Sequence, residues 1–280
     1  MKEKLAIITS GGGARCSWSV GVMLALAKEY NLTTPDLLIS ASGSAGTGAY
    51  FIARQYESIR HIWSSFLSTT KLINFLRFWR IVDIDYLIDE IFRNLDPLDE
   101  VKVKNSKTEF LIPALKKSNG QVVYFSNHSN VSIFEAMRAT KAMPIAYTLP
   151  VKINGERYCD SPLTSAAKTH ISKAIELGAT KILVVDASYN KSTGRLYGAL
   201  FNFWTLFRSN LFRKNYKKQV KNVNNYNTEK KVISIHYLRF PDNLKGSILD
   251  TSIIFLNEAI RIGYKSTKHD LALRKFLATK

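Results

Sequence analysis

The fold is decided by the stretch Leu37-Leu38-Ile39-Ser40-Ala41-Ser42-Gly43-Ser44-Ala45-Gly46-Thr47-Gly48, in which an apolar strand runs into a series of small residues. A helical pattern follows over residues 49–54. Strand, tight turn and helix together predict a nucleophile elbow, in which a serine stands at the apex with strained backbone angles. Small residues are needed there because the strand and the helix pass within contact distance.

We expect Ser44 at the apex of this elbow. Gly46 stands two residues after it, and Ser42 occupies the place of the usual glycine two residues before it. The G-x-S-x-G pattern is therefore met as S-G-S-A-G, with serine as a small replacement. The alternative is a glycine- and serine-rich loop that merely ends a strand, and this stretch alone does not decide between the two.

A second glycine-rich turn precedes the elbow. A predicted strand over residues 4–10 ends in Gly11-Gly12-Gly13-Ala14-Arg15, and a helical pattern follows over residues 17–30. Such a loop directs backbone N–H groups at an anion, which suits either a dinucleotide phosphate or an oxyanion hole. The dinucleotide reading lacks its third glycine and the acid that closes the second strand. An oxyanion hole is favoured because the elbow falls on the next strand, so both loops should share one edge of a sheet.

The remaining pattern predicts an α/β protein. We expect a largely helical, apolar region over residues 55–94, with an amphipathic helix at 83–92, then a hairpin over 108–126 and a helix over 132–142. A strand pair over residues 149–160 should turn at Asn154-Gly155 and end at Asp160. Another helix over 164–177 should be closed by Gly178, and a buried strand should follow over 182–185. A further strand near residues 232–237 and two helices complete the chain.

Composition limits the functional classes. The chain has 280 residues, 46% of them hydrophobic, which is enough for a sizeable core. No segment reaches the eighteen apolar residues of a membrane span, and the two cysteines have neither a disulfide framework nor a metal spacing. We therefore expect a reducing compartment, no metal and no cofactor. The net charge of +18 predicts an anionic partner surface, either lipid headgroups or nucleic acid.

Three motifs in order, Gly12-Gly13-Ala14-Arg15, Ser44-Ala45-Gly46 and Tyr158-Cys159-Asp160, resemble those of the patatin-like phospholipases. The segment Ala139-Thr140-Lys141-Ala142-Met143-Pro144 also resembles the one that precedes the family's aspartate. The resemblance implies a three-layer sandwich with a mostly parallel central sheet flanked by helices. It extends over a core of about residues 4–190 in a single domain of residues 1–280, with a basic, aromatic and helical extension from about 195 to 280.

The resemblance also implies the chemistry of a serine acyl hydrolase that cleaves lipid esters. Ser44 would attack the ester carbonyl, Asp160 would take its proton, and the main-chain N–H groups of Gly12, Gly13 and Ala14 would hold the oxyanion, with Arg15 supporting the loop. A normal carboxylate is a weak base, so burial should raise the pKa of Asp160. The five histidines carry no motif, which disfavours a histidine triad.

Three departures from the family pattern replace glycines. Cys16 ends the oxyanion motif, Ser42 precedes the elbow serine, and Ser161 follows Asp160. Glycine-specific backbone angles at these positions would be strained. A catalytically weakened, lipid-binding relative is therefore the first alternative function, and a nucleotide- or nucleic-acid-binding α/β protein is the second.

Aromatic and then basic residues follow the core. An interfacial helix places its rings among lipid headgroups and its lysines against anionic lipid, whereas a solvated helix face is the alternative. The expected membrane-contact residues are Trp204, Phe207, Arg213, Lys214, Lys217 and Lys218. The hypothesis is a cytoplasmic protein in peripheral contact with the inner face of a membrane, with a lipid ester as substrate and no nucleic acid partner; the sequence does not indicate an oligomeric state.

Overall fold

The computed structural model describes residues 3–69, 71–188, 193–224 and 233–278. The strands in this part of the chain are β1 (Leu5–Thr9), β2 (Leu37–Ser40), β3 (Glu109–Lys116), β4 (Val122–Ser126), β5 (Val151–Ile153), β6 (Glu156–Cys159), β7 (Lys181–Asp186) and β8 (Ser234–Arg239). The helices are α1 (Cys16–Glu29), α2 (Ser44–Ile52), α3 (Tyr56–His61), α4 (Glu100–Lys104), α5 (Ile133–Lys141), α6 (Pro162–Ser165), α7 (Ala167–Glu176), α8 (Thr193–Thr205), α9 (Asn210–Asn224), α10 (Ile253–Lys268) and α11 (Leu271–Ala278). A 3₁₀ turn, η1 (Gly13–Arg15), and two π-helical segments, η2 (Ile62–Phe66) and η3 (Tyr86–Leu95), are also present.

The described strands form one mostly parallel sheet in the order β5-β6-β3-β2-β1-β7-β8, with β4 paired to β3. Strands β3, β2, β1, β7 and β8 run parallel, whereas β4, β5 and β6 are antiparallel to their neighbours. Thr9 of β1 lies opposite both Ser40 of β2 and Val185 of β7. The loops after these three strands therefore leave the sheet at the same edge, as we expected for the glycine-rich turn and the elbow.

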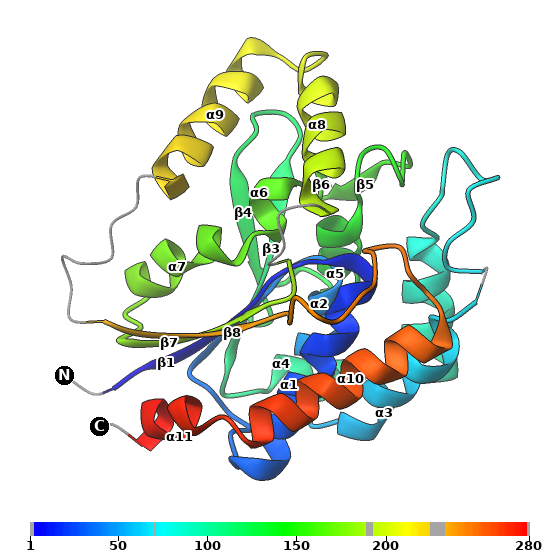
Figure 1. Cartoon of the computed structure of the whole chain (residues 1–280). Coiled ribbons are helices and arrows are strands. Elements are labelled where there is room, and N and C mark those ends of the chain that lie inside the picture. Colours follow the sequence, from blue (N-terminus) through cyan, green and yellow to red (C-terminus); the bar gives the residue numbers. More distant parts are fainter. Residues whose placement is uncertain (1–2, 70, 189–192, 225–232, 279–280) are drawn as a thin grey trace.

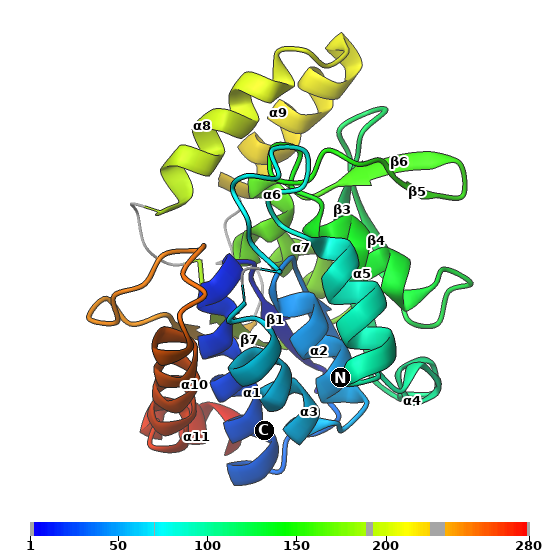
Figure 2. The same cartoon turned by 90° about the vertical axis from the view of Figure 1, so that its right-hand side faces the viewer.

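Helices cover both faces of the sheet (Figure 1; Figure 2). One apolar core lies between the sheet and α1, α2, α5 and α10, and a second lies between the sheet and α7. The arrangement confirms the three-layer α/β sandwich predicted from the sequence. Near-continuous apolar runs such as Ile182-Leu183-Val184-Val185 form the middle strands because these strands are covered on both sides.

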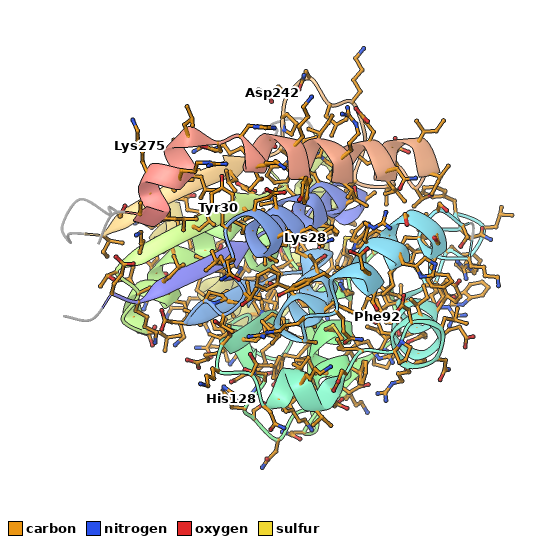
Figure 3. The ribbon with its side chains drawn as sticks, turned by 90° about the horizontal axis from the view of Figure 1, so that it is seen from below. Lys28, Tyr30, Phe92, His128, Asp242 and Lys275 are labelled. Carbon is orange, nitrogen blue, oxygen red and sulfur yellow. The ribbon has the colours of Figure 1, made fainter. Side chains whose placement is uncertain are left out.

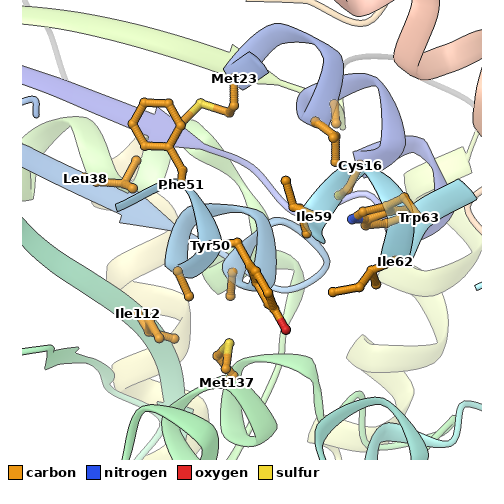
Figure 4. Packing of buried hydrophobic residues seen from close by; sticks show 14 of the residues in the cluster. Cys16, Met23, Leu38, Tyr50, Phe51, Ile59, Ile62, Trp63, Ile112 and Met137 are labelled. Carbon is orange, nitrogen blue, oxygen red and sulfur yellow. The ribbon is translucent and has the colours of Figure 1, made fainter. Parts of the chain in front are cut away.

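Helix α2, which follows the elbow, is buried along its whole length. Figure 4 shows Phe51 pointing toward Met23 of α1 and Leu38 of β2, whereas Tyr50 points toward Met137 of α5. Both aromatic side chains are at most 1% exposed. A helix enclosed in this way also takes its polar first residue, Ser44, into the interior.

The C-terminal part of the chain packs against the N-terminal part. Helix α10 lies alongside α1, as the view from below shows (Figure 3), and β8 adds to the edge of the sheet next to β7. The strand predicted near residues 232–237 is thus β8, and Val232 lies outside the described residues.

Two predicted helices differ from the structure. Residues 55–94 were expected to be largely helical, but between η2 and η3 the chain forms a loop, closed by a bridge between Ile73 and Val82. Arg77 donates a 2.7 Å hydrogen bond to the Asp83 carboxylate there, so the loop is held by an ion pair that helical periodicity does not indicate. The helix expected over residues 164–177 is two helices, α6 and α7, separated at Ala166, whose backbone is extended.

Candidate active site

A cavity of about 310 Å³ lies at the edge of the sheet where β1, β2, β6 and β7 end. Its floor is polar and its walls are apolar. The floor comprises main-chain or polar groups of Gly12, Gly13, Ser42, Lys141 and Asp160. The walls include Trp63, Leu67, Leu87, Phe92, Tyr197 and Leu256. An ester could therefore meet polar groups at one end while its apolar part is removed from water.

Ser42 stands at the turn between β2 and α2. Its φ of 49° is in the left-handed region, which is strained for a residue other than glycine. The residue is partly exposed and lines the cavity. Its main-chain N–H donates to Oγ1 of Thr140 at 3.0 Å. Ser42 thus has both the position and the backbone strain that a nucleophile elbow requires.

Ser44, in contrast, is not brought to the cavity. It is the first residue of α2, it is fully buried, and it is not among the described residues that line the cavity. Its hydroxyl lies beside the thiol of Cys16, whose pKa burial raises to about 11. The strained backbone that we expected at Ser44 occurs at Ser42 instead.

Asp160 follows β6 and is 1% exposed. Its Oδ1 accepts hydrogen bonds from the Ser161 N–H at 2.7 Å, from Thr164 Oγ1 at 2.9 Å and from Ser165 Oγ at 2.9 Å. Burial raises the pKa of the carboxyl to about 6, although hydrogen bonds, including one from the Ser42 hydroxyl, oppose the shift. The other oxygen, Oδ2, makes no well-formed hydrogen bond within the described residues. Asp160 is thus held through one oxygen, and its raised pKa agrees with the sequence-based expectation.

The glycine-rich turn presents two main-chain donors. Within the described part of the chain, no hydrogen bond engages the N–H of Gly12 or of Gly13. Gly13 has φ 56°, and a Cβ at this position would lie 2.2 Å from the carbonyl oxygen of Ile248, so a larger residue would be excluded. The expectation for Ala14 is wrong, because its N–H donates to the Ile248 carbonyl at 2.8 Å.

Arg15 supports the turn from the interior and is not among the described residues that line the cavity. Arg15 is 2% exposed, and its guanidinium lies 3.8 Å from the centre of the Phe240 ring. Burial lowers the pKa of Arg15, because the charged guanidinium is less favourable in the interior than in water. The cation–π contact with Phe240 and the nearby carboxylates of Asp186 and Asp242 offset that cost. Gly46, in contrast, lines the cavity next to Phe92, and a Cβ on Gly46 would lie 2.8 Å from the Phe92 ring.

Two of the three expected strains do not occur. Cys16 has helical backbone angles, with φ −65°. Ser161 has φ −155°, an extended conformation open to any residue, and it caps α6 through a hydrogen bond from the Thr164 N–H. Of the three positions where glycine is replaced, only Ser42 adopts a left-handed conformation.

Lys141 is a floor residue that the sequence did not indicate as functional. Its Nζ donates to the carbonyl oxygens of Ser42 at 2.6 Å and of Gly43 at 3.4 Å. Histidine is absent from the described cavity lining. His170 is buried behind the site, contacts the Thr164 carbonyl and the Tyr124 hydroxyl, and has a pKa lowered to about 4 by burial, which agrees with a structural role.

The predicted membrane-contact residues lie on α8, α9 and the turn between them. Phe207 and the lysines Lys214, Lys217 and Lys218 are exposed. Trp204 is half-buried, with the Arg208 guanidinium 4.3 Å from its ring centre, and Arg213 is half-buried with a hydrogen bond to the Leu206 carbonyl. Exposed apolar side chains at the α8–α9 turn form one cluster, made up of Phe203, Leu206, Phe207 and Leu211. A second exposed apolar cluster, made up of Phe75, Leu76, Phe78 and Trp79, lies on the loop between η2 and η3. None of the helices in the described ranges combines the length and apolar character of a membrane span.

Comparison with known proteins gives a family and a fold. The family described as patatin-like phospholipase matches residues 7–170. No curated protein matches the sequence. The crystal structure of VipD from Legionella pneumophila is similar with a TM-score of 0.52 at 11% identity, and the match covers 95% of this chain and 66% of that chain. At this identity the similarity shows the fold alone, and this chain spans only 66% of the length of that structure.

Proposed function

Because the chain belongs to the patatin-like phospholipase family, we propose that it hydrolyses carboxylic esters of lipids, with Ser42 as nucleophile and Asp160 as general base. The observation that carries the proposal is that both residues line the floor of one cavity with apolar walls. The Ser42 hydroxyl is also among the groups that lower the pKa of the Asp160 carboxyl, so the two side chains interact.

The proposal moves the nucleophile from Ser44, the residue expected from the sequence, to Ser42. Three observations support the change: Ser42 is the more exposed, it has the left-handed backbone of an elbow apex, and its hydroxyl interacts with Asp160. Ser44 would have to leave the interior beside Cys16 to reach an ester.

The proposed acylation step begins with attack of Ser42 Oγ on the ester carbonyl carbon. The serine proton passes to Oδ2 of Asp160, the carboxylate oxygen without a well-formed hydrogen bond in the described structure. Collapse of the tetrahedral intermediate breaks the bond to the alcohol, which leaves with the proton from Asp160. Water then attacks the acyl-enzyme and gives its proton to Asp160, and the released Ser42 oxygen is reprotonated as the fatty acid departs.

The developing oxyanion would be held by the main-chain N–H groups of Gly12 and Gly13. Both belong to the cavity floor, and neither has another partner among the described residues. Loss of one such donor typically costs about 10²–10³ in rate. The same arrangement disfavours a dinucleotide loop, because the N–H groups of Gly11 and Ala14 are engaged by the Ser165 and Ile248 carbonyls.

The apolar walls favour a substrate with an acyl chain. Trp63, Leu87 and Phe92 come from η2 and η3, and Leu256 comes from α10. Removing apolar surface from water contributes about 25 cal/mol per Å², so each buried methylene adds to binding. We expect long-chain esters to bind more tightly than short-chain esters with the same headgroup.

Two exposed apolar clusters, on the loop between η2 and η3 and on the α8–α9 turn, would bring the protein to an anionic membrane surface. Leu72, Ile73 and Val82, at the base of the loop between η2 and η3, line the cavity, as does Tyr197 of α8. The loop, in cyan, and the α8–α9 turn, in yellow, both project in the upper half of Figure 1. Exposed lysines of α9 supply positive charge, and each lysine or arginine near an anionic leaflet contributes about 1 kcal/mol.

A fluorophosphonate probe tests the proposed nucleophile, because it reacts covalently with activated serines. We expect mass spectrometry of the labelled protein to place the adduct on Ser42, and we expect the Ser44→Ala variant to be labelled as well as the natural protein. An adduct on Ser44 would reject the assignment. Absence of any serine adduct, with retained binding to lipid vesicles, would support the weakened lipid-binding relative instead.

A further inference from the structure

The end of helix α5 contacts both residues of the proposed dyad. Thr140 accepts the Ser42 N–H, and Lys141 donates to the Ser42 carbonyl. The next residue, Ala142, accepts the main-chain N–H of Asp160 at 2.9 Å. Three consecutive residues therefore join the elbow to the strand end that carries the carboxylate, although Ser42 and Asp160 are far apart in the sequence.

Lys141 is an unusual residue to find in this place. It is 8% exposed. Among the described residues that line the cavity, Lys141 is the one basic residue and Asp160 is the one carboxylate. Burial of an ammonium group is unfavourable unless hydrogen bonds and an opposite charge compensate. Here two elbow carbonyls accept its protons, and the Asp160 carboxylate, which lines the same cavity, favours the ammonium by its charge without forming a direct ion pair.

We propose that Lys141 is a positioning residue of the dyad: its ammonium group fixes the elbow carbonyls and keeps a positive charge in the cavity that the Asp160 carboxylate also lines. This inference rests on the proposed function. The first effect matters because left-handed backbone at a serine is strained and persists only when its surroundings hold it. The second matters because a general base must be ionised, and a nearby cation would add to the hydrogen bonds that already oppose the effect of burial on the Asp160 pKa.

The charge on Lys141 depends on pH. Burial lowers the pKa of Lys141 to about 8. Two acidic groups, Cys16 of α1 and Asp160, act in the opposite direction and raise the lysine pKa, but their effect is smaller than that of burial. The carboxyl of Asp160 has a pKa of about 6. Between these values the carboxylate and the ammonium coexist. Activity should therefore rise with pH as Asp160 loses its proton and fall at higher pH as Lys141 loses its own.

The test is the pH dependence of kcat/KM on a soluble short-chain ester for the natural protein and for Lys141→Met. The variant should have a kcat lower by about 10- to 100-fold, as expected for a small displacement of a nucleophile, with KM little changed. Its acid limb should move to higher pH because the cation that favours the carboxylate is gone, and the alkaline limb near pH 8 should disappear. Limbs that stay in place, whatever the rate, would overturn the proposal.

Two further variants keep the test decisive. Lys152→Met changes an exposed lysine of β5 and should leave the profile unchanged. Lys141→Arg retains a permanent charge, so its acid limb should stay in place while the alkaline limb is lost; this outcome is informative even if Lys141→Met does not fold. Fluorophosphonate labelling of natural protein separates the two proposals: labelled Ser42 with unmoved limbs rejects only the role of Lys141, whereas no label on Ser42 rejects the dyad.

Discussion

Gly21 of α1 and Gly263 of α10 lie where the two helices pass with their backbones in contact. A Cβ on Gly21 would lie 2.0 Å from the Ile260 carbonyl oxygen, and a Cβ on Gly263 would lie 2.2 Å from the Trp18 carbonyl oxygen. Both obstacles are backbone atoms, which cannot rotate away as the end of a side chain can. Since α10 contributes Leu256 to the cavity wall, this contact also positions the proposed acyl site.

We predict that Gly21→Ala and Gly263→Ala each destabilise the protein. Overpacking of this kind typically costs about 1–3 kcal/mol, which lowers Tm by several degrees in a chain of this size. Differential scanning calorimetry measures the change. Gly198→Ala in α8 is the matched control, because nothing lies within 4 Å of a Cβ at this position and alanine is the better helix former. Equal Tm values for all three variants would show that the helices can separate without cost.

The raised pKa of Asp160 predicts an opposition between stability and activity. Because the pKa rises from 3.8 to about 6 on folding, the native state binds this proton more tightly than the unfolded state. Stability is therefore lost as pH rises from about 4 to about 6, by up to about 3 kcal/mol for this group. Asp160→Asn should thus raise Tm at pH 7.5, give little gain at pH 4, and abolish most ester hydrolysis.

Thermal denaturation at the two pH values checks this prediction. Glu90→Gln, which changes an exposed carboxylate on η3, is the control and should change neither Tm nor turnover. If Asp160→Asn lowered Tm at pH 7.5, the carboxylate would be stabilising in the folded protein, contrary to the burial that raises its pKa.

The membrane proposal predicts that the exposed apolar residues act together with the lysines. The protein should sediment with vesicles that contain phosphatidylglycerol, much less with neutral vesicles, and added salt should release it. Phe78→Ser on the loop between η2 and η3 and Phe207→Ser on the α8–α9 turn should each weaken sedimentation. Replacing Lys214, Lys217 and Lys218 with glutamine should weaken it further while sparing hydrolysis of a soluble ester.

Leu271→Ser is the control for these variants, because Leu271 is 71% exposed on α11, which lies at the opposite end of the molecule from the α8–α9 turn (Figure 1). It should sediment like the natural protein. Sedimentation that is equal for neutral and anionic vesicles and unaffected by every substitution would leave both clusters without a role at a membrane.

Local patterns predicted much of the fold. Apolar runs located β1, β2 and β7, the Asn154-Gly155 turn located the β5–β6 pair, and Gly178, with φ 88°, ends α7 as expected. The hairpin of β3 and β4 is also confirmed. These elements depend on residues close together in the chain, so periodicity and turn residues suffice to indicate them.

The details of the candidate site depend on contacts that no local pattern contains. Both S-A-S-G-S and S-G-S-A-G place small residues around a serine, and the choice between Ser42 and Ser44 depends on where β2 ends. Ala14 is engaged by Ile248, far along the chain. Lys141 reaches Ser42 across 99 residues. The one local signal that favoured Ser42 was its position two residues after the apolar strand.

The most direct test of the account compares Ser42→Ala with Ser44→Ala in the hydrolysis of a soluble ester at pH 7. The account predicts that Ser42→Ala lowers kcat/KM by at least about 10³, whereas Ser44→Ala, which removes a hydroxyl from the interior beside Cys16, retains kcat/KM within about tenfold of the natural protein. Full activity in Ser42→Ala together with loss of activity in Ser44→Ala would contradict it.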